Sequence, residues 1–242
     1  MFETFLIKPL YNAFVYLIGV VPQGDVGLAI IALTLLIRII FYPAFTASIR
    51  TQMGMQAAQA EIDEINKKYK DNSEERARRT LALYKEKKIR PFAGLIALLV
   101  QIPIFIALYI ALFQEGLPNI AEHLLYPFVK VPEIVSINFF GLLDLTAPNN
   151  ILLSILVGVL QFLVAYLSMG RIKSSVDSMP KERQAAHKVQ YNMMLYIFPA
   201  VMAVISYTLP AAVGLYFAAS NLISIGQEWI IRRQMERKAQ NP

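Results

Sequence analysis

The sequence predicts an all-α polytopic membrane protein with five transmembrane helices forming a groove, an N-terminal amphipathic helix and a cytoplasmic antiparallel helical hairpin. Its 242 residues are 56% hydrophobic, and their mean hydropathy of +0.48 is too high for a soluble domain of this size. The apolar residues gather in runs of roughly the 20 residues that a helix needs to cross a bilayer. Lys and Arg lie mostly in alternate segments between these runs, which predicts an orientation as well as a fold.

The first segment, residues 1–24, is predicted to be an amphipathic or partly embedded helix. Lys8 and Pro9 interrupt it, and its apolar stretch of about 12 residues is short for a span. It has neither the basic start of a signal peptide nor the Arg- and Ser-rich composition of a transit peptide. A short additional span is the alternative.

Five longer apolar runs are predicted to be the spans. Residues 46–90 carry 11 Lys and Arg, residues 170–190 carry five and residues 232–242 carry four, whereas only Lys8 and Lys130 lie in the other intervening segments. The positive-inside rule therefore places the N-terminus outside and the C-terminus in the cytoplasm. The predicted order after the N-terminal helix is a first span (25–49), a cytoplasmic hairpin (50–90), a second span (91–114), an external interfacial segment (115–149), a third span (150–170), a cytoplasmic loop (171–190), a fourth span (191–209), a fifth span (210–232) and a cytoplasmic tail (233–242).

The hairpin is predicted from two apolar seams at helical spacing. Alternating steps of three and four residues form the first seam, and similar steps form the second. Asn72 is expected to cap the second helix, with the Glu75 side chain reaching back to it. We interpret the hairpin as a docking arm for a partner, whose basic residues could also lie on anionic lipid headgroups. A solvated linker is the alternative. The seam residues are Met55, Ala58, Ile62, Ile65 and Tyr69, then Ala77, Leu81 and Tyr84.

A single charge interrupts the first span. Arg38 stands in the apolar stretch TLLIRIIFYP, roughly 18 Å of helix after Val26, which places it past the bilayer midplane on the cytoplasmic side. Such a charge needs water or a partner, and snorkelling to the interface is the alternative interpretation. Since the spans hold no Asp or Glu except Asp25 and Glu228 at their ends, we expect Arg38 to have no partner within the chain.

The other polar side chains inside the spans are uncharged. Thr34 lies one turn before Arg38 on the same helix face. Singly, such residues commonly link helices through hydrogen bonds. Together with Arg38 they predict a wet interior groove. They comprise Thr34, Gln101, Gln161, Ser206, Tyr207, Thr208, Ser220, Asn221 and Ser224.

Several classes of chemistry are disfavoured by composition. The chain has no Cys, and its two His lie in polar segments without metal-ligand spacing. An ion-coupled carrier normally places carboxylates at the midplane, and an intramembrane protease needs a catalytic pair or a zinc motif. We therefore expect no metal, no cofactor and no enzymatic activity.

Two stretches carry a resemblance to a known family. ALYKEKKIRPFAGLIALLVQIPIFIALY (82–109) and LPAAVGLYFAASNLISIGQ (209–227) resemble the signature regions of the YidC family of membrane insertases, which includes the Oxa-type and Albino-type proteins. TLLIRIIFYP resembles that family's first core helix. The resemblance covers residues from about 5 to 233. Phe217 stands where the family often has Trp or Tyr, and unlike them it cannot form a side-chain hydrogen bond.

The resemblance implies a membrane protein insertase and chaperone that hydrolyses nothing. A groove open to the cytoplasm and to lipid receives the polar tail of a client, while the client's apolar segment moves along a hydrophobic slide. In the first span, Arg38 and Thr34 match the family's groove. In the fifth span, the positions that match the groove or face the substrate are Tyr216, Phe217, Ser220 and Ser224. The implied slide residues are Ile96, Ile102, Pro103, Phe105, Val201, Met202 and Ile205.

The implied partners are nascent membrane proteins, membrane lipids, a ribosome or targeting factors at the cytoplasmic loops, and a Sec-type translocon. No direct nucleic-acid readout is expected. The absence of a transit peptide favours the cytoplasmic membrane of a prokaryote, and the chain is expected to lack the extra N-terminal span of Gram-negative members. Two alternatives remain: a small-anion carrier or channel that uses Arg38 as its selectivity charge, and a structural adaptor whose groove is inert.

Overall fold

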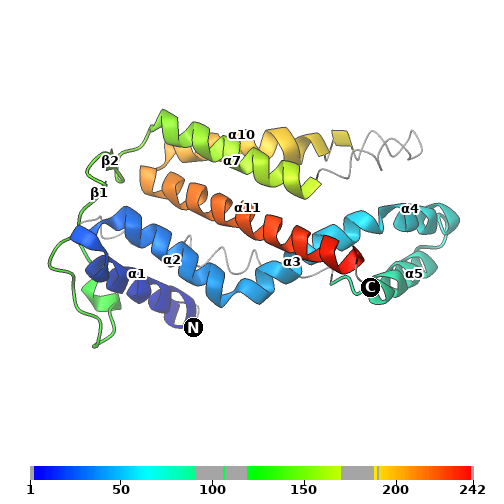
Figure 1. Ribbon diagram of the computed structural model, residues 1–242, viewed down its shortest axis with the longest axis horizontal. Helices are drawn as coiled ribbons and strands as arrows, with labels where there is room; N and C mark the ends of the chain where they lie inside the picture. The colour runs from blue at the N-terminus through cyan, green and yellow to red at the C-terminus, as the bar shows by residue number, and fades with distance from the viewer. Residues whose placement is uncertain (1–2, 91–105, 107–118, 170–187, 190, 241–242) are drawn as a thin grey trace. The chain divides into compact units, whose positions relative to one another are not determined.

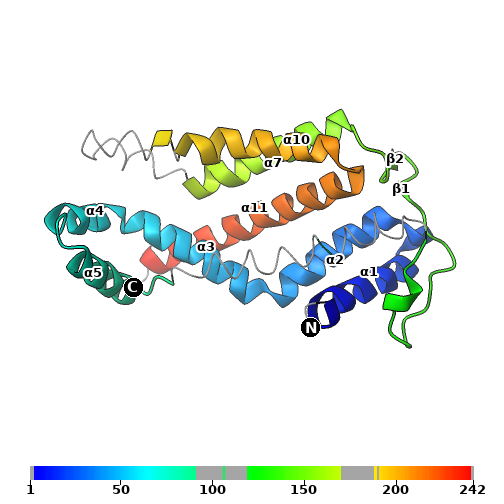
Figure 2. The same cartoon turned by 180° about the vertical axis from the view of Figure 1, so that it is seen from behind.

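The computed structural model describes residues 3–90, 106, 119–169, 188–189 and 191–240 (Figures 1 and 2). This part of the chain is mostly helical, as the sequence predicts. It also contains a two-stranded antiparallel pair that the all-α prediction lacks, formed by β1 (Asn138–Phe139) and β2 (Leu143–Asp144). The chain divides into two compact units, Met1–Phe41 with Leu98–Gln161 and Pro199–Ile223, and Tyr42–Ala97 with Phe162–Phe198 and Ser224–Pro242.

In the first unit, α1 (Lys8–Val20) packs along α2 (Val26–Ile40), as Figure 1 shows. A short π-helix, Glu3–Ile7, leads into α1, and a 3-10 turn, Pro22–Gly24, separates α1 from α2. Apolar residues on one side of α1, among them Tyr11, Phe14 and Ile18, are almost completely buried, whereas Tyr16 and Val20 are exposed. Helix α1 therefore has one packed side and one exposed side, which fits the predicted amphipathic character.

The segment predicted to be external is tied to the start of α2. Asp25 caps this helix, because one carboxylate oxygen accepts from the Leu28 amide and the other from the Phe140 amide. Val26 and Ser136 continue the attachment through backbone hydrogen bonds. Gly24 has a φ of +62°, and a Cβ placed on it would lie 2.0 Å from the Ile134 carbonyl oxygen. Only glycine fits this crossing.

The same segment also holds α1. Asn12 is 3% exposed and makes three hydrogen bonds, donating to the carbonyls of Lys8 and Leu124 and accepting from the Tyr126 amide. Tyr11 accepts from the Ala121 amide through its buried hydroxyl. A 3-10 turn, Glu122–Leu124, lies between these anchor points. The sequence prediction of a peripheral helix did not include these anchors.

Three further helices begin or end in the first unit. They are α7 (Ile151–Met169), α10 (Phe198–Thr208) and α11 (Ala211–Gln240), and a π-helical turn, Met193–Ile197, precedes α10. Asn150 caps α7 by accepting from the Leu153 amide. A Cβ on Gly158 would lie 3.0 Å from the Ala203 Cβ, and one on Gly214 would lie 2.5 Å from the Ser206 Oγ. These small residues permit close helix packing, as is common between membrane helices.

Within the described residues, one helix is long and apolar enough to cross a membrane by length and composition, Ile151–Ser168. Val26–Ile40 and Tyr42–Met55 pass the same test when taken together, and Met193–Thr208 is apolar but shorter. The second predicted span, 91–114, lies outside the described residues except for Ile106. The count of five spans stays a prediction.

In the second unit, α3 (Tyr42–Ala57) is followed by α4 (Gln59–Lys68) and α5 (Ser73–Glu86). Helices α4 and α5 lie side by side, joined by the turn after Tyr69 (Figures 1 and 2). Ala58, Leu83 and Ile89 form a small buried cluster, with Met55, Ile62, Ile65 and Tyr84 packed against it. Four of the five residues of the first predicted seam, Met55, Ala58, Ile62 and Ile65, therefore belong to this cluster.

The second seam was wrong at two positions. Leu81 is 55% exposed and Ala77 is exposed, while Leu83 is 7% exposed and lies in the cluster. A shift of two residues turns a helix face by more than half a turn, so the buried face of α5 is displaced from the predicted one. The chain's return at Ile89, which also packs on this face, explains the displacement.

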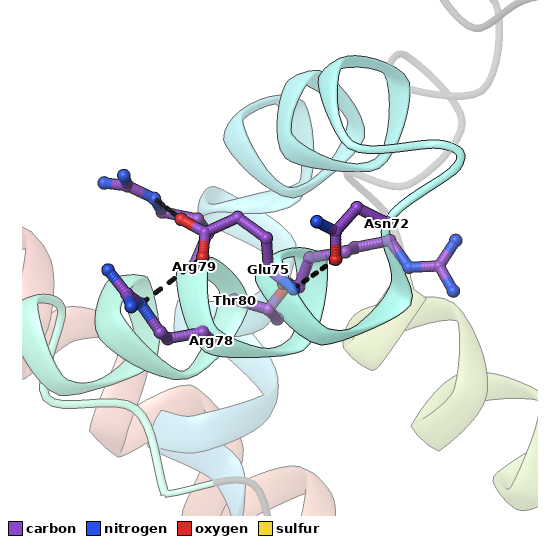
Figure 3. Close-up of polar contacts among 6 residues, drawn as sticks. Asn72, Glu75, Arg78, Arg79 and Thr80 are labelled. Carbon is purple, nitrogen blue, oxygen red and sulfur yellow. Dashed lines mark hydrogen bonds and ion pairs between the residues drawn. The ribbon is translucent and has the colours of Figure 1, made fainter.

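The predicted cap of α5 is present, but Glu75 does not complete a capping box. The Asn72 side chain accepts from the Glu75 amide at 3.0 Å (Figure 3). The Glu75 carboxylate points along the helix instead, to Arg79 at 2.8 Å and Arg78 at 3.5 Å (Figure 3). Two cations one turn ahead compete with the Asn72 amide for this carboxylate, and the pairs at i+3 and i+4 are the ones that form.

Candidate functional site

The candidate site in the first unit is centred on Arg38. Its guanidinium Nη2 donates to the Ser220 hydroxyl at 3.0 Å and to the Ser220 carbonyl at 3.3 Å. The expectation that Arg38 has no partner within the chain is therefore wrong. Both of these Ser220 acceptors are neutral, so they fix the guanidinium without cancelling its charge.

Arg38 lies at the border between two faces of α2. Ile30, Leu33 and Ile37 are 3% exposed or less, whereas Leu35, Ile39 and Ile40 are between 48% and 63% exposed. Arg38 itself is half-buried. A helix with one packed face and one exposed apolar face is typical of a membrane helix at the edge of a bundle. The charge is thus placed where the packed interior meets the apolar surface.

Thr34 lies one turn before Arg38 and is 4% exposed. Its hydroxyl donates to the Ile30 carbonyl at 2.7 Å, so it is engaged with its own helix. Thr34 is therefore on the predicted face, although its hydroxyl hydrogen is already committed.

Helix α11 supplies the facing side of the site. Ser220 and Asn221 are 7% and 8% exposed, and Tyr216 is 1% exposed. Small residues precede them, including Ala211, Ala212 and Gly214, so the helix packs closely along this stretch. Phe217 is half-buried, and rings 216 and 217 are 5.5 Å apart. The structure thus brings Arg38 to Ser220, with Tyr216, Phe217 and Asn221 on the neighbouring positions of α11.

Two buried polar atoms in the first unit have no hydrogen-bond partner among the described residues. They are the Asn221 side-chain nitrogen and the Ser206 hydroxyl. Leaving a buried polar group unsatisfied costs roughly 1–3 kcal/mol. Such groups usually indicate a water or another polar group nearby. Both residues belong to the set of polar positions that the sequence placed inside the spans.

The structure does not assign the remaining predicted groove residues to the Arg38 site. Gln161 is half-buried on α7, at the last position of the first unit before Phe162. Ser224 lies one turn after Ser220 on α11, is half-buried, and belongs to the second unit. Gln101 lies outside the described residues. The assignment of these three residues to a groove stays a prediction.

Part of the predicted slide can be described. On α10, Val201 is 46% exposed, while Met202 and Ile205 are half-buried. Val204 is also 61% exposed, and Ser206 faces inward at 1% exposure. The helix therefore presents an open apolar face. The slide positions of the second predicted span, Ile96, Ile102, Pro103 and Phe105, lie outside the described residues.

A polar cluster in the second unit lies further along α11. Glu228 is 4% exposed and pairs with Arg232 at 2.7 Å, and it also accepts from the Ser168 hydroxyl at 3.0 Å. Arg232 donates to the Leu167 carbonyl as well, which ties α11 to the end of α7. Glu228 is thus committed to Arg232 and Ser168. Among the described residues no group of three or more Asp, Glu or His could hold a metal ion.

The sequence alone did not reveal three features of the structure. The Ser220 bond to Arg38 joins residues 182 positions apart, and periodicity carries no information on such pairs. The Asp25 cap could have been found, because an Asp directly before an apolar run is a recognised helix start. Asn12 offered no such signal, because a single polar residue in an amphipathic helix is normally predicted to lie on its exposed face.

Comparison with known proteins places this geometry in context. A family model described as 60Kd inner membrane protein matches residues 18–238. The chain is 31% identical over 242 residues to a membrane protein insertase YidC of Oceanobacillus iheyensis, covering 98% of this chain and 86% of that protein. It is 30% identical to a membrane protein insertase YidC of Histophilus somni, covering 97% of this chain but 38% of that protein. It therefore spans little more than a third of the length of such longer relatives.

Proposed function

Because the chain belongs to the 60Kd inner membrane protein family, we propose that it is a membrane protein insertase and chaperone of a bacterial cytoplasmic membrane. The relatives named as insertases support this activity, and the arrangement around Arg38 supports a mechanism. In that mechanism the polar tail of a client enters beside Arg38. The client's apolar segment follows the open face of α10 and passes into lipid.

The observation that carries the mechanism is the bond from Arg38 to Ser220. A guanidinium held by a hydroxyl and a carbonyl is fixed in place and keeps its positive charge. Its position at the edge of the packed face of α2 gives it access to both the interior and the apolar surface. The buried Asn221 side chain, beside Ser220, adds a polar group that favours water at this point.

Such a site can move a tail without consuming fuel. Full burial of one Leu-sized side chain is worth roughly 1.5–3 kcal/mol, so an apolar client segment offsets the cost of several polar groups. The membrane potential, positive outside, draws an acidic tail outward with about 2.3 kcal/mol per charge per 100 mV. Short acidic tails should therefore cross well, and long basic tails poorly.

The proposal includes the predicted topology, with the N-terminus outside and the C-terminus in the cytoplasm. In that orientation α4 and α5 stand in the cytoplasm, where they would meet a ribosome, a targeting factor or a Sec-type translocon. Basic residues exposed on α5, such as Arg78, suit acidic or phosphate-bearing surfaces.

Purified protein in liposomes tests the proposal. A single-span client with a short acidic tail is added, and protection of the tail from external protease reports its translocation. Arg38→Ala should slow this step, and Arg38→Lys should retain more activity because it keeps the charge. Equal loss in both variants would favour geometry over charge. Anion flux without insertion would favour the carrier interpretation and contradict the proposal.

The matched control is Tyr16→Phe, which removes a hydroxyl from a side chain of α1 that is 60% exposed and belongs to neither the predicted groove nor the predicted slide. It should insert the client at the wild-type rate. Photocrosslinking from positions 34, 38, 202 and 216 to a stalled client would map the path directly. Crosslinks at 202 to the apolar segment and at 38 to the tail are expected, and the reverse pattern would contradict the mechanism.

A further inference from the structure

A second site is suggested by a cavity in the second unit. It has a volume of about 680 Å³ and lies between α3, the residues that follow α5, and the last turns of α11. This volume is within the range of small-molecule sites. Arg50, Lys87, Lys88 and Arg90 all line it, and none of the described residues that line it is an Asp or Glu. Four cations around one cavity repel one another unless an anion lies among them.

One of these cations, Lys87, forms an ion pair with a carboxylate that does not line the cavity. Lys87 donates to Glu61 at 2.6 Å, and both side chains are more than 40% exposed. The pair orients Lys87 at the rim, and Glu61 itself is not among the described residues that line the cavity. The local potential is therefore positive, which favours an anionic ligand.

Lys88 gives an independent indication. Its φ is +54°, a left-handed conformation in which glycine is normally found at a helix end. The Lys88 amide donates to the Lys85 carbonyl and the Ile89 amide to the Tyr84 carbonyl, the two bonds of a Schellman motif. The local fold would favour glycine here, so a lysine that lines the cavity suggests a role for its side chain.

Most of the remaining lining is apolar, and Thr46, Thr51 and Gln234 are its uncharged polar members. Tyr42, Pro43, Ala47, Ile89 and Met235 contribute, and Tyr42 and Pro43 directly follow the apolar helix α2. A free phosphate would need the cations alone. A lining that is cationic on one part and apolar on another suits a phosphate that carries an acyl chain, and Tyr is enriched where a span meets the headgroups.

We infer that this cavity binds an anionic phospholipid, with the phosphate among Arg50, Lys88 and Arg90 and the upper acyl chain against the apolar lining. The lipid would hold the start of α3, the end of the α4–α5 pair and the tail of α11 together. The inference does not rest on the insertase proposal, because Arg38 takes no part in it.

Native mass spectrometry of the full chain, released from nanodiscs, tests this inference. Phosphatidylglycerol should be retained in preference to phosphatidylcholine. Arg50→Gln and Lys88→Gly should each weaken phosphatidylglycerol binding about fivefold. Lys88→Gly is the informative variant, because it relieves the backbone while removing the charge. It should lose lipid yet melt at or above the wild-type temperature when delipidated.

Two controls complete the experiment. Arg78→Gln removes a cation with 75% side-chain exposure on α5 that does not line the cavity, and it should leave lipid retention unchanged. Arg38→Ala should also retain the lipid, so a failure of the insertase proposal leaves this result intact. Equal retention of both lipids, equal loss in Arg78→Gln, or displacement by millimolar inorganic phosphate would each overturn the assignment.

Discussion

Two regions of this protein are held together by different kinds of interaction. The N-terminal cap consists of α1, residues 119–149 and the first turn of α2. It is fixed by buried and partly buried hydrogen bonds, which Asn12 donates to the Leu124 carbonyl and which Tyr11 and Asp25 accept from the Ala121 and Phe140 amides. The helical arm, α4 with α5, is fixed by a small apolar cluster and by the exposed ion pair of Lys87 with Glu61. Both regions are joined to predicted spans, yet their interactions differ in strength and in directionality.

The difference predicts how each region responds to change. A buried hydrogen bond leaves an unsatisfied partner when one side is removed, and a glycine crossing admits no larger residue. Exposed ion pairs are weak and screened by salt. We therefore expect the N-terminal cap to hold one arrangement, and the helical arm to open at low cost, as suits a region that meets partners.

The largest effect should come from Gly24→Ala in the N-terminal cap. The new Cβ would lie 2.0 Å from the Ile134 carbonyl oxygen, and the backbone would keep a φ of +62°. We expect a loss of unfolding free energy on the order of 4 kcal/mol or more. The thermal midpoint in detergent and protease cleavage within residues 119–149 measure it.

Gly141→Ala is the matched control. Gly141 has a φ of +70°, but a Cβ there meets no atom within 4 Å. Gly141→Ala should lower the free energy of unfolding only by the strain of an alanine at positive φ, roughly 1–2 kcal/mol. Equal destabilisation by the two substitutions would show that the crossing at Gly24 does not set the stability of the N-terminal cap.

The next effect concerns Asn12→Ala. This change removes the partner of the buried Leu124 carbonyl and of the partly buried Tyr126 amide. We expect a loss of roughly 2–4 kcal/mol, since each such group costs about 1–3 kcal/mol. Tyr11→Phe removes one bond and should cost less, and Tyr16→Phe, at an exposed position, should cost almost nothing. Amide hydrogen exchange at 121–126 reports the loosening, and unchanged exchange would contradict it.

Sequence alone predicted the helical class and the features that depend on local pattern. The Asn72 cap followed from residue type and spacing, and most of the first seam followed from periodicity. The buried face of α5 could not be predicted, because Ile89 returns after the helix and selects Leu83 over Leu81. The Arg38–Ser220 bond and the Asn12 anchor join distant parts of the chain, and tertiary contacts of this kind leave no trace in a single sequence.

A smaller effect should distinguish two leucines of the helical arm. Leu83→Ala removes a side chain that is 7% exposed in the apolar cluster, and it should cost about 2 kcal/mol. Leu81→Ala removes one that is 55% exposed and should stay within about 0.5 kcal/mol of wild type. Hydrogen exchange over 59–86 measures both. A larger loss of stability in Leu81→Ala than in Leu83→Ala would show that Leu81 is on the buried face, as periodicity predicted.

The smallest effect belongs to the exposed pair of Lys87 and Glu61. The hydrogen bond to Glu61 raises the pKa of the Lys87 ammonium above the ordinary lysine value. A raised pKa means that the pair stabilises the folded arm below the ordinary lysine pKa, and that this contribution is lost as pH rises through the raised value. Titration of the Lys87 side-chain carbon by NMR should show the upward shift in wild type, its loss in Glu61→Gln, and its reduction at high salt. A Lys87 pKa that is the same with and without Glu61 would mean that the pair is not populated in solution, and that the apolar cluster alone closes the helical arm.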